Sequence, residues 1–168
     1  RNSILFEGEF AMQSSRHIKA SLLSLNLGYK TDQFDWIKSL TAGLDIVSGD
    51  DSKTDELEGF SKYFGARHKH HGYYDYSSHK KYFGHAHEGL QELNLKGKFN
   101  FLASSNLLVA MHSFSSHDGI TKYGNELDLI IKRKVSDELS SEFGLVFYDP
   151  EEGNDLLTFM YVMFTANF

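Results

Sequence analysis

The chain ends in LLTFMYVMFTANF, residues 156–168, a stretch whose alternate residues differ in character. Counting back by twos from the last residue gives an apolar set, namely Phe168, Ala166, Phe164, Val162 and Met160. The intervening set is more mixed and includes Asn167 and Thr165. Successive side chains of a β-strand point to opposite faces, so this stretch predicts a strand with one apolar face. It is too short for a membrane-spanning helix, which needs about 20 apolar residues.

The same alternation recurs along the rest of the chain, and no segment shows a convincing helical stripe. The predicted strands cover residues 4–13, 20–30, 36–47, 91–102, 106–114, 124–135, 141–148 and 156–168. The clearest is 91–102, where Leu93, Leu95, Phe99 and Phe101 alternate with Glu92, Asn94, Lys96, Lys98 and Asn100. Strands of roughly ten residues cross a bilayer when they are tilted. The sequence therefore predicts an all-β fold, a transmembrane antiparallel up-and-down β-barrel with eight candidate strands.

Composition narrows the possible functions. The 168 residues are 40% hydrophobic with a mean hydropathy of −0.39, which fits a soluble protein but also a barrel whose polar lumen dilutes the lipid face. The absence of cysteine excludes a disulfide or cysteine–zinc scaffold, and the net charge of −6 gives no electrostatic case for nucleic acid. The chain begins at Arg1 without a signal-peptide pattern, so we expect a mature chain or a piece of a longer one.

The connections between the predicted strands differ in length in a regular way. Short turns at 31–35, 103–106 and 136–140 would share one end of the barrel, and longer connections at 48–89, 115–123 and 149–155 would share the other. This is the pattern of outer-membrane barrels, with the short turns periplasmic, although the connection 14–18 is short for an outer loop. It predicts one barrel domain or barrel segment over 1–168, with 48–89 as a long extracellular loop rich in His and Tyr. Phe168 also resembles the sorting signal that is read by the barrel assembly machinery.

A soluble alternative produces the same alternation. A lipocalin-like or sandwich protein would place the apolar set inside and the charged set in water. The charged set, which includes Glu92, Lys96 and Lys98, is too charged to fill a narrow dry interior, although it could form a solvated exterior. Alternation alone leaves both interpretations open, and the aromatic C-terminus favours the membrane barrel.

Several short motifs follow one another through the second half of the chain. They are Ser48-Gly49-Asp50, then Phe60, Phe64, His68, Gly72 and Asp75, then Gly89-Leu90-Gln91, and finally Gly124-Asn125-Glu126-Leu127-Asp128. In this order and approximate spacing, residues 36–168 resemble the C-terminal part of the alginate-export family of outer-membrane barrels. The resemblance implies the bacterial outer membrane and a barrel of about 18 strands. The chain would then be either a C-terminal segment, completed by missing N-terminal strands of the same barrel, or a reduced barrel.

The charged faces of the predicted strands would line the lumen. The predicted lining residues are Lys30, Asp45, Glu92, Lys96, Lys98, His112, Glu126, Asp128, Lys132 and Lys134. A route for an anionic uronate polymer should be basic, and this set is mixed. We therefore expect a channel in outer-membrane lipid for a polar solute, an ion or an anionic or neutral saccharide. The alternative is a small structural or adhesion-type barrel whose outer loop binds a partner, because a closed eight-stranded barrel is filled by side chains and conducts little.

Histidines invite metal-binding and catalytic interpretations. Most of them lie between 68 and 117, namely His68, His70, His71, His79, His85, His87, His112 and His117. Imidazole suits zinc and copper, but the spacings fit no standard site, so no metal and no cofactor are predicted. We expect instead a polar loop that folds into the lumen or covers its mouth.

Catalysis has little support in the sequence. His112 and Ser113 would point to opposite faces of a strand. His112 and Glu126 could touch in the lumen, but a carboxylate–histidine pair without a nucleophile predicts no enzyme.

Overall fold

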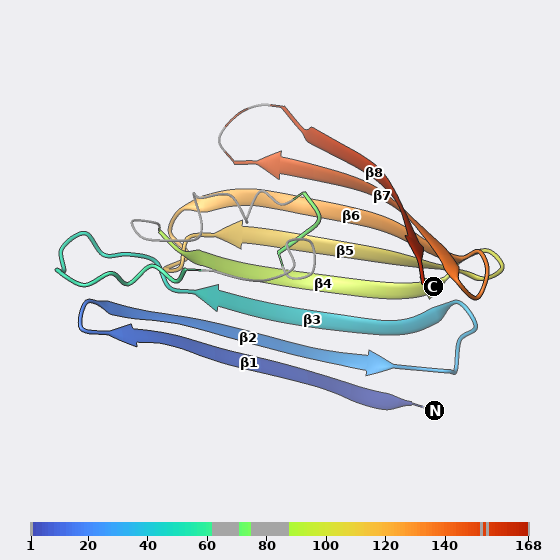
Figure 1. Cartoon of the computed structure of the whole chain (residues 1–168), viewed down its shortest axis with the longest axis horizontal. Coiled ribbons are helices and arrows are strands. Elements are labelled where there is room, and N and C mark those ends of the chain that lie inside the picture. The colour runs from blue at the N-terminus through green and yellow to red at the C-terminus, as the bar shows by residue number, and fades with distance from the viewer. Residues whose placement is uncertain (1, 62–70, 75–87, 152, 154, 168) are drawn as a thin grey trace.

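The chain folds into a single antiparallel β-sheet (Figure 1), seen in a computed structural model that describes residues 2–61, 71–74, 88–151, 153 and 155–167. The eight strands lie side by side in sequence order. They are β1 (Ser3–Ser15), β2 (Ile18–Lys30), β3 (Ile37–Val47), β4 (Leu90–Asn100), β5 (Ser105–Ser115), β6 (Lys122–Lys134), β7 (Leu139–Pro150) and β8 (Leu157–Ala166). This confirms the predicted all-β, up-and-down antiparallel order. Each strand lies within a few residues of its predicted range.

The sheet is not closed into a barrel. Closure would need a ladder between the first and last strands, whereas β1 pairs only with β2 and β8 only with β7 among the described strands. Both edges are also open to solvent, because nearly every residue of β1 and of β8 is exposed whichever face it points to. The prediction of an up-and-down arrangement is thus confirmed, and a barrel closed by these strands alone is not what the structure contains.

The two faces of the sheet have opposite character. On one face, which we call the outer face, large apolar side chains are exposed, with Leu93 and Leu95 of β4 at 55% and 58% and Phe164 of β8 at 68%. On the other, the inner face, polar side chains of the central strands are buried, and Glu92 is 0% exposed. Strand alternation explains how neighbours such as Glu92 and Leu93 differ so much. The usual relation between polarity and burial is inverted across the sheet.

The inner face carries an apolar core at one end of the sheet. This core consists of the buried residues Ala20, Val47, Phe60, Leu90, Phe114, Tyr123 and Tyr148. Two phenols tie it to the backbone, since the Tyr148 hydroxyl donates to the carbonyl of Tyr123 at 2.9 Å and the Tyr123 hydroxyl donates to that of Gly89 at 3.0 Å. A buried phenol needs such a partner, and these two fix the ends of β4, β6 and β7 against one another.

Residues of the Ser-Gly-Asp motif fasten the base of the connection between β3 and β4. Ser48 Oγ accepts from the Ser21 amide at 2.9 Å and donates to the carbonyl of Glu58 at 2.6 Å. Asp50 Oδ1 accepts from the Glu58 amide at 2.7 Å. Gly49 packs against the backbone of Glu88, and an added β-carbon would lie 2.5 Å from the Glu88 carbonyl oxygen. The motif therefore holds together the start and the end of the connection.

The connections sort by length as the sequence predicts. The turns after β2, β4 and β6 lie at the same end of the sheet as both termini, and the longer connections after β3, β5 and β7 lie at the opposite end (Figure 1). We call these the turn end and the loop end. The part of the chain that the structure describes contains no helix long and apolar enough to cross a membrane.

Candidate functional site

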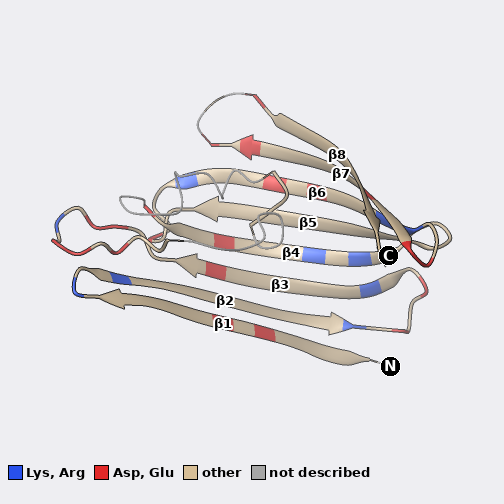
Figure 2. Cartoon of the chain, viewed as in Figure 1, with Lys and Arg blue, Asp and Glu red and all other residues tan. Residues whose placement is uncertain are grey.

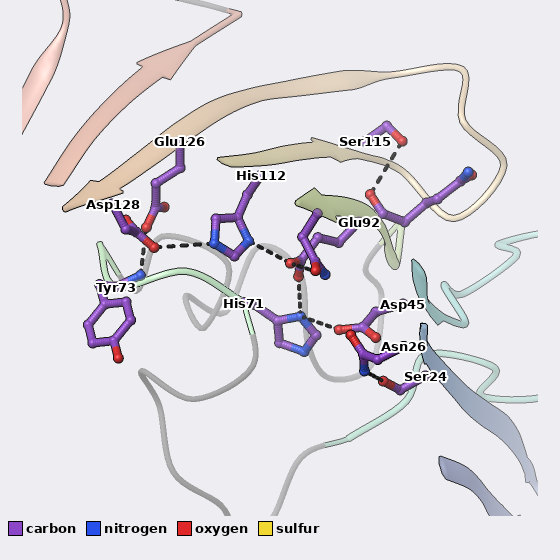
Figure 3. A network of polar contacts seen from close by, with 12 residues as sticks. Ser24, Asn26, Asp45, His71, Tyr73, Glu92, His112, Ser115, Glu126 and Asp128 are labelled. Carbon is purple, nitrogen blue, oxygen red and sulfur yellow. Dashed lines mark hydrogen bonds and ion pairs between the residues drawn. The ribbon is translucent and has the colours of Figure 1, made fainter. Parts of the chain in front are cut away.

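A row of buried polar side chains crosses the inner face near the loop end (Figure 3). The strand register creates this row, since Asp45 of β3 faces Glu92 of β4 and His112 of β5 faces Glu126 of β6. The members are Asp45, Glu92, Asn94, His112, Glu126 and Asp128 on four adjacent strands, with His71 from the connection. We call these seven residues the inner cluster.

Glu92 stands at the centre of the inner cluster. Its Oε2 lies 2.7 Å from Nδ1 of His71, and its Oε1 lies 2.6 Å from Nδ1 of His112. Asn94 Nδ2 donates to Oε1 at 3.1 Å. His71 Nδ1 is also 3.5 Å from Asp45 Oδ2. One carboxylate thus holds two imidazoles in place, one from a strand and one from the connection.

His112 links Glu92 to the next strand, but through a different residue from the one predicted. Its Nε2 lies 3.2 Å from Asp128 Oδ2, and its ring stacks on Phe114 at a centroid distance of 5.7 Å. Glu126, the residue directly opposite, instead accepts from the backbone amides of Tyr73 and Tyr74 at 2.6 and 2.9 Å. The register of the predicted pair is therefore right, and the contact of the imidazole is with Asp128.

Residues 71–74 lie directly on the inner face. Gly72 adopts φ +79°, and a β-carbon there would collide with the Glu126 carboxylate, so glycine is required. Tyr73 stacks on Tyr161 at 6.1 Å and Tyr74 on Tyr148 at 5.4 Å. Burial raises the pKa of the Tyr73 phenol. These four residues of the connection therefore lie on the inner face of the sheet, and the predicted position in a lumen or over its mouth stays a prediction.

The lysines predicted for the lumen lie apart from the inner cluster. Asp45, Glu92, Glu126 and Asp128 lie toward the loop end, whereas Lys30, Lys96, Lys98, Lys132 and Lys134 lie toward the turn end (Figure 2). Lys132 pairs with Glu142 at 2.7 Å and Lys134 with Asp137 at 2.5 Å. Lys30 and Lys98 are exposed. The lysines of the predicted lining thus occupy a different part of the inner face from the acids of the inner cluster, because they occur later in β4 and β6 than those acids do.

A polar hollow occupies the inner face beside β1 to β4. It has a volume of about 190 Å³ and is lined by Glu7, Glu9, Ser24, Asn26, Ser39, Thr41, Lys96 and Lys98. Its lining mixes carboxylates, ammonium groups, hydroxyls and amides. Such a surface can hydrogen-bond a hydroxylated or charged solute.

The remaining residues of the sequence motifs that the structure describes lie outside the inner cluster. Ser48, Gly49 and Asp50 form the base of the connection, and Gly124 lies opposite Pro150 at the loop end of the β6–β7 ladder. His68 and Asp75 lie outside the described residues, as do Phe64, His70, His79, His85, His87 and the terminal Phe168. His117 is exposed in the connection after β5.

Sequence reasoning missed how the inner cluster is assembled. Alternation placed Glu92, His112 and Asp128 on one face, but nothing in the sequence singled out His71 among the histidines of the connection. The sequence assigns Asn94 to the polar set but does not predict that its amide donates to Glu92. The sequence also gives no sign that Tyr148 and Tyr161 stack on Tyr74 and Tyr73.

The chemistry of the inner cluster follows from its charges. It holds four carboxylates and two imidazoles, and among the described residues no lysine or arginine forms an ion pair with those carboxylates. Ser113 is exposed on the outer face, so it cannot serve His112 as a nucleophile. The arrangement suits binding of a cation or of protons better than covalent catalysis.

Comparisons with protein-family models, with curated proteins and with solved structures give no match to this chain.

Proposed function

We propose that this sheet forms part of the wall of a transmembrane β-barrel in the bacterial outer membrane and contributes to a channel for polar solutes. The observation that carries the proposal is the inversion of the two faces. Along β4 the exposed side chains include Leu93 and Leu95, and the buried ones include Glu92 and Asn94. A barrel wall in lipid has this arrangement, with apolar residues outward and polar residues inward.

The extent of the apolar outer face argues against water on that side. The exposed apolar set runs from the first strand to the last and includes Ile4, Phe6, Phe10, Leu27, Leu40, Leu93, Leu95, Met111, Met160, Val162 and Phe164. Monomeric soluble proteins rarely expose contiguous apolar patches beyond a few hundred Å². Lipid chains would cover this face without any partner protein.

Aromatic residues at the turn end support the same interpretation. Trp36 stacks on Phe99 at 6.0 Å and lies 6.4 Å from Phe34. Trp36 and Phe34 are both exposed. Barrels in the outer membrane carry aromatic girdles at the two interfaces with water. This group would form part of the girdle on the side of the short turns.

The open edges favour a segment of a larger barrel. In hydrocarbon every backbone amide and carbonyl must be paired, so β1 and β8 cannot both face lipid unpartnered. Further strands of the same barrel would satisfy both edges, and the resemblance to the alginate-export family implies about 18 strands in total. Outer-membrane lipid and these additional strands are therefore the proposed partners, together with the assembly machinery that would read Phe168.

The inner face indicates the kind of solute. The polar hollow offers Lys96 and Lys98 together with Glu7 and Glu9, and hydroxyls and amides lie between them. This mixed lining fits an ion or a neutral or anionic saccharide rather than an apolar compound. Passive passage along it needs no catalytic residue.

The position of residues 71–74 favours a second candidate, a structural or adhesion-type barrel whose lumen is filled. The backbone of Tyr73 and Tyr74 sits on Glu126, so part of the inner face is already occupied. Such a barrel would carry no stable ion current. The two candidates differ in conductance and agree on the membrane.

Single-cysteine labelling tests the membrane proposal, because the chain contains no native cysteine. Leu95→Cys and Lys96→Cys are neighbours on opposite faces of β4. In lipid vesicles a water-soluble thiol reagent should modify Lys96→Cys and leave Leu95→Cys unmodified until detergent is added. Equal labelling of both positions would overturn the proposal. A planar-bilayer recording of the same protein then separates channel from filled barrel.

A further inference from the structure

We infer that Asp45, His71 and Glu92 form a binding site for a divalent transition-metal ion that fastens residues 71–74 to the inner face. Each residue offers one ligand atom, and the three atoms lie within 4.8 Å of one another. All three residues are buried. The inference does not depend on whether the sheet crosses a membrane.

The shortest contact in the site fits replacement of a proton by a metal. His71 Nδ1 and Glu92 Oε2 lie 2.7 Å apart, the distance of a shared proton between two potential ligands. Asp45 Oδ2 is 3.5 Å from the same nitrogen. A metal ion would displace that proton and move the nitrogen and oxygen slightly apart, because ligands must lose their protons to bind metal.

An unpartnered oxygen gives an independent reason to expect a cation. Asp45 is 4% exposed, and its Oδ1 has no hydrogen-bond partner among the described residues. Figure 3 shows this carboxylate directed at His71. Asn94 Oδ1, beside Glu92, is likewise buried without a partner. These atoms are all acceptors, so the group that satisfies them must be a donor or a cation.

The charge of the whole inner cluster points the same way. The cluster holds four carboxylates against two imidazoles, and among the described residues no lysine or arginine is ion-paired with those carboxylates. A buried charge is tolerated when it is paired or coordinates a metal. A divalent ion bound between Asp45 and Glu92 would add positive charge next to two buried carboxylates.

The surroundings of Glu92 resemble those of a metal-ligating carboxylate. Its second oxygen is held by His112 Nδ1 at 2.6 Å and by Asn94 Nδ2 at 3.1 Å. Partners of this kind orient ligands in metal sites. A mixed set of one imidazole and two carboxylates suits zinc, manganese or a similar ion better than calcium or magnesium, which bind through oxygen alone.

Zinc titration of the full chain in detergent, after chelator treatment, tests the site. Asp45→Asn and Glu92→Gln should each lower the affinity for zinc by at least about tenfold. Glu9→Gln, a carboxylate elsewhere on the inner face, should leave the affinity unchanged. Unchanged binding by Asp45→Asn and Glu92→Gln would overturn the proposal, since zinc would then sit on other histidines of the connection.

A spectroscopic measurement on the unaltered protein keeps the test decisive if a variant fails to fold. X-ray absorption at the zinc edge should show one zinc per chain with mixed nitrogen and oxygen ligands and a single imidazole. A spectrum dominated by three or more imidazoles, or no zinc retained after gel filtration, would contradict the site.

Discussion

Nδ1 of His71 lies 2.7 Å from Oε2 of Glu92, so a residue of the long connection is bound to a residue near the start of β4, 21 positions away. Glu92 in turn holds His112 on its other oxygen. The connection is therefore not a separate outer loop over its whole length. In residues 71–74 it is part of the inner face, and it converts a row of carboxylates into a closed polar cluster.

Among the described histidines, replacing His112 should lower the free energy of unfolding the most. His112→Ala leaves the buried carboxylates of Glu92 and Asp128 without their common partner. Breaking a buried ion pair on one side typically costs about 3–5 kcal/mol of folding free energy. Urea unfolding in detergent measures the change. His117→Ala, at an exposed position, is the control and should stay within about 0.5 kcal/mol. Similar small effects for both variants would show that the imidazole bridge does not stabilise the sheet.

Leu95→Arg should reveal what covers the outer face. Leu95 is 58% exposed, and in water such a replacement would change stability by no more than about 0.5 kcal/mol. On the lipid face near the midplane, arginine should cost about 2–4 kcal/mol. Unfolding from lipid vesicles distinguishes the two values. Lys96→Arg on the inner face is the matched control, and an equal effect of both variants would argue against lipid contact.

Gly49→Ala should destabilise the base of the connection. A β-carbon at Gly49 would press on the backbone of Glu88, which cannot rotate away as a side chain could. Overpacking of this kind costs about 1–3 kcal/mol. Gly8→Ala is the control, because its β-carbon would meet Leu25 at an ordinary 3.5 Å. Thermal unfolding of the two variants gives the comparison, and a harmless Gly49→Ala would show that the base is loosely packed.

Charge reversal at Lys96 and Lys98 should change the ion preference of the proposed channel. The double variant Lys96→Glu, Lys98→Glu makes the polar hollow wholly acidic and should shift the reversal potential in a salt gradient toward cation selectivity. Lys53→Glu, in the connection after β3, should have a smaller effect. An unchanged potential in a folded double variant would remove these lysines from the solute path.

Lowering the pH should destabilise the turn after β5, because protonation of Asp118 weakens the hydrogen bonds that its carboxylate accepts. This carboxylate accepts from the Ser116 hydroxyl at 2.6 Å and from the Ile120 amide at 3.0 Å, and these bonds lower its pKa. A lowered folded-state pKa means that the stabilisation is complete above the ordinary aspartate value and is lost as pH falls through the folded value. The protection of the Ile120 amide against hydrogen exchange, expressed relative to the intrinsic rate at each pH, should fall in this window. Asp118→Asn should remove most of that dependence.

The local sequence determines where most strands lie and which face each of their residues occupies. The alternation in 91–102 is enough to place β4 and to assign Glu92 and Leu93 to opposite faces, because the period of a strand is set by its own backbone. Strands that follow one another in the sequence pair as antiparallel neighbours, and the sequence places His112 and Glu126 on the same face of two such strands, where the structure finds them opposite each other. Which face is covered by lipid and which by protein stays a prediction.

Tertiary structure decided the contacts and the shape. Opposite residues in a register are not obliged to touch, and His112 reaches the diagonal neighbour Asp128 because diagonal positions lie within range of long side chains. His71 enters the cluster only because the base at Ser48 and the stacking of Tyr74 on Tyr148 set the path of the connection. These contacts join residues far apart in the chain, so no local pattern encodes them. The open edges at β1 and β8 have the same origin, since closure depends on the twist of the whole sheet rather than on the pattern of any one strand.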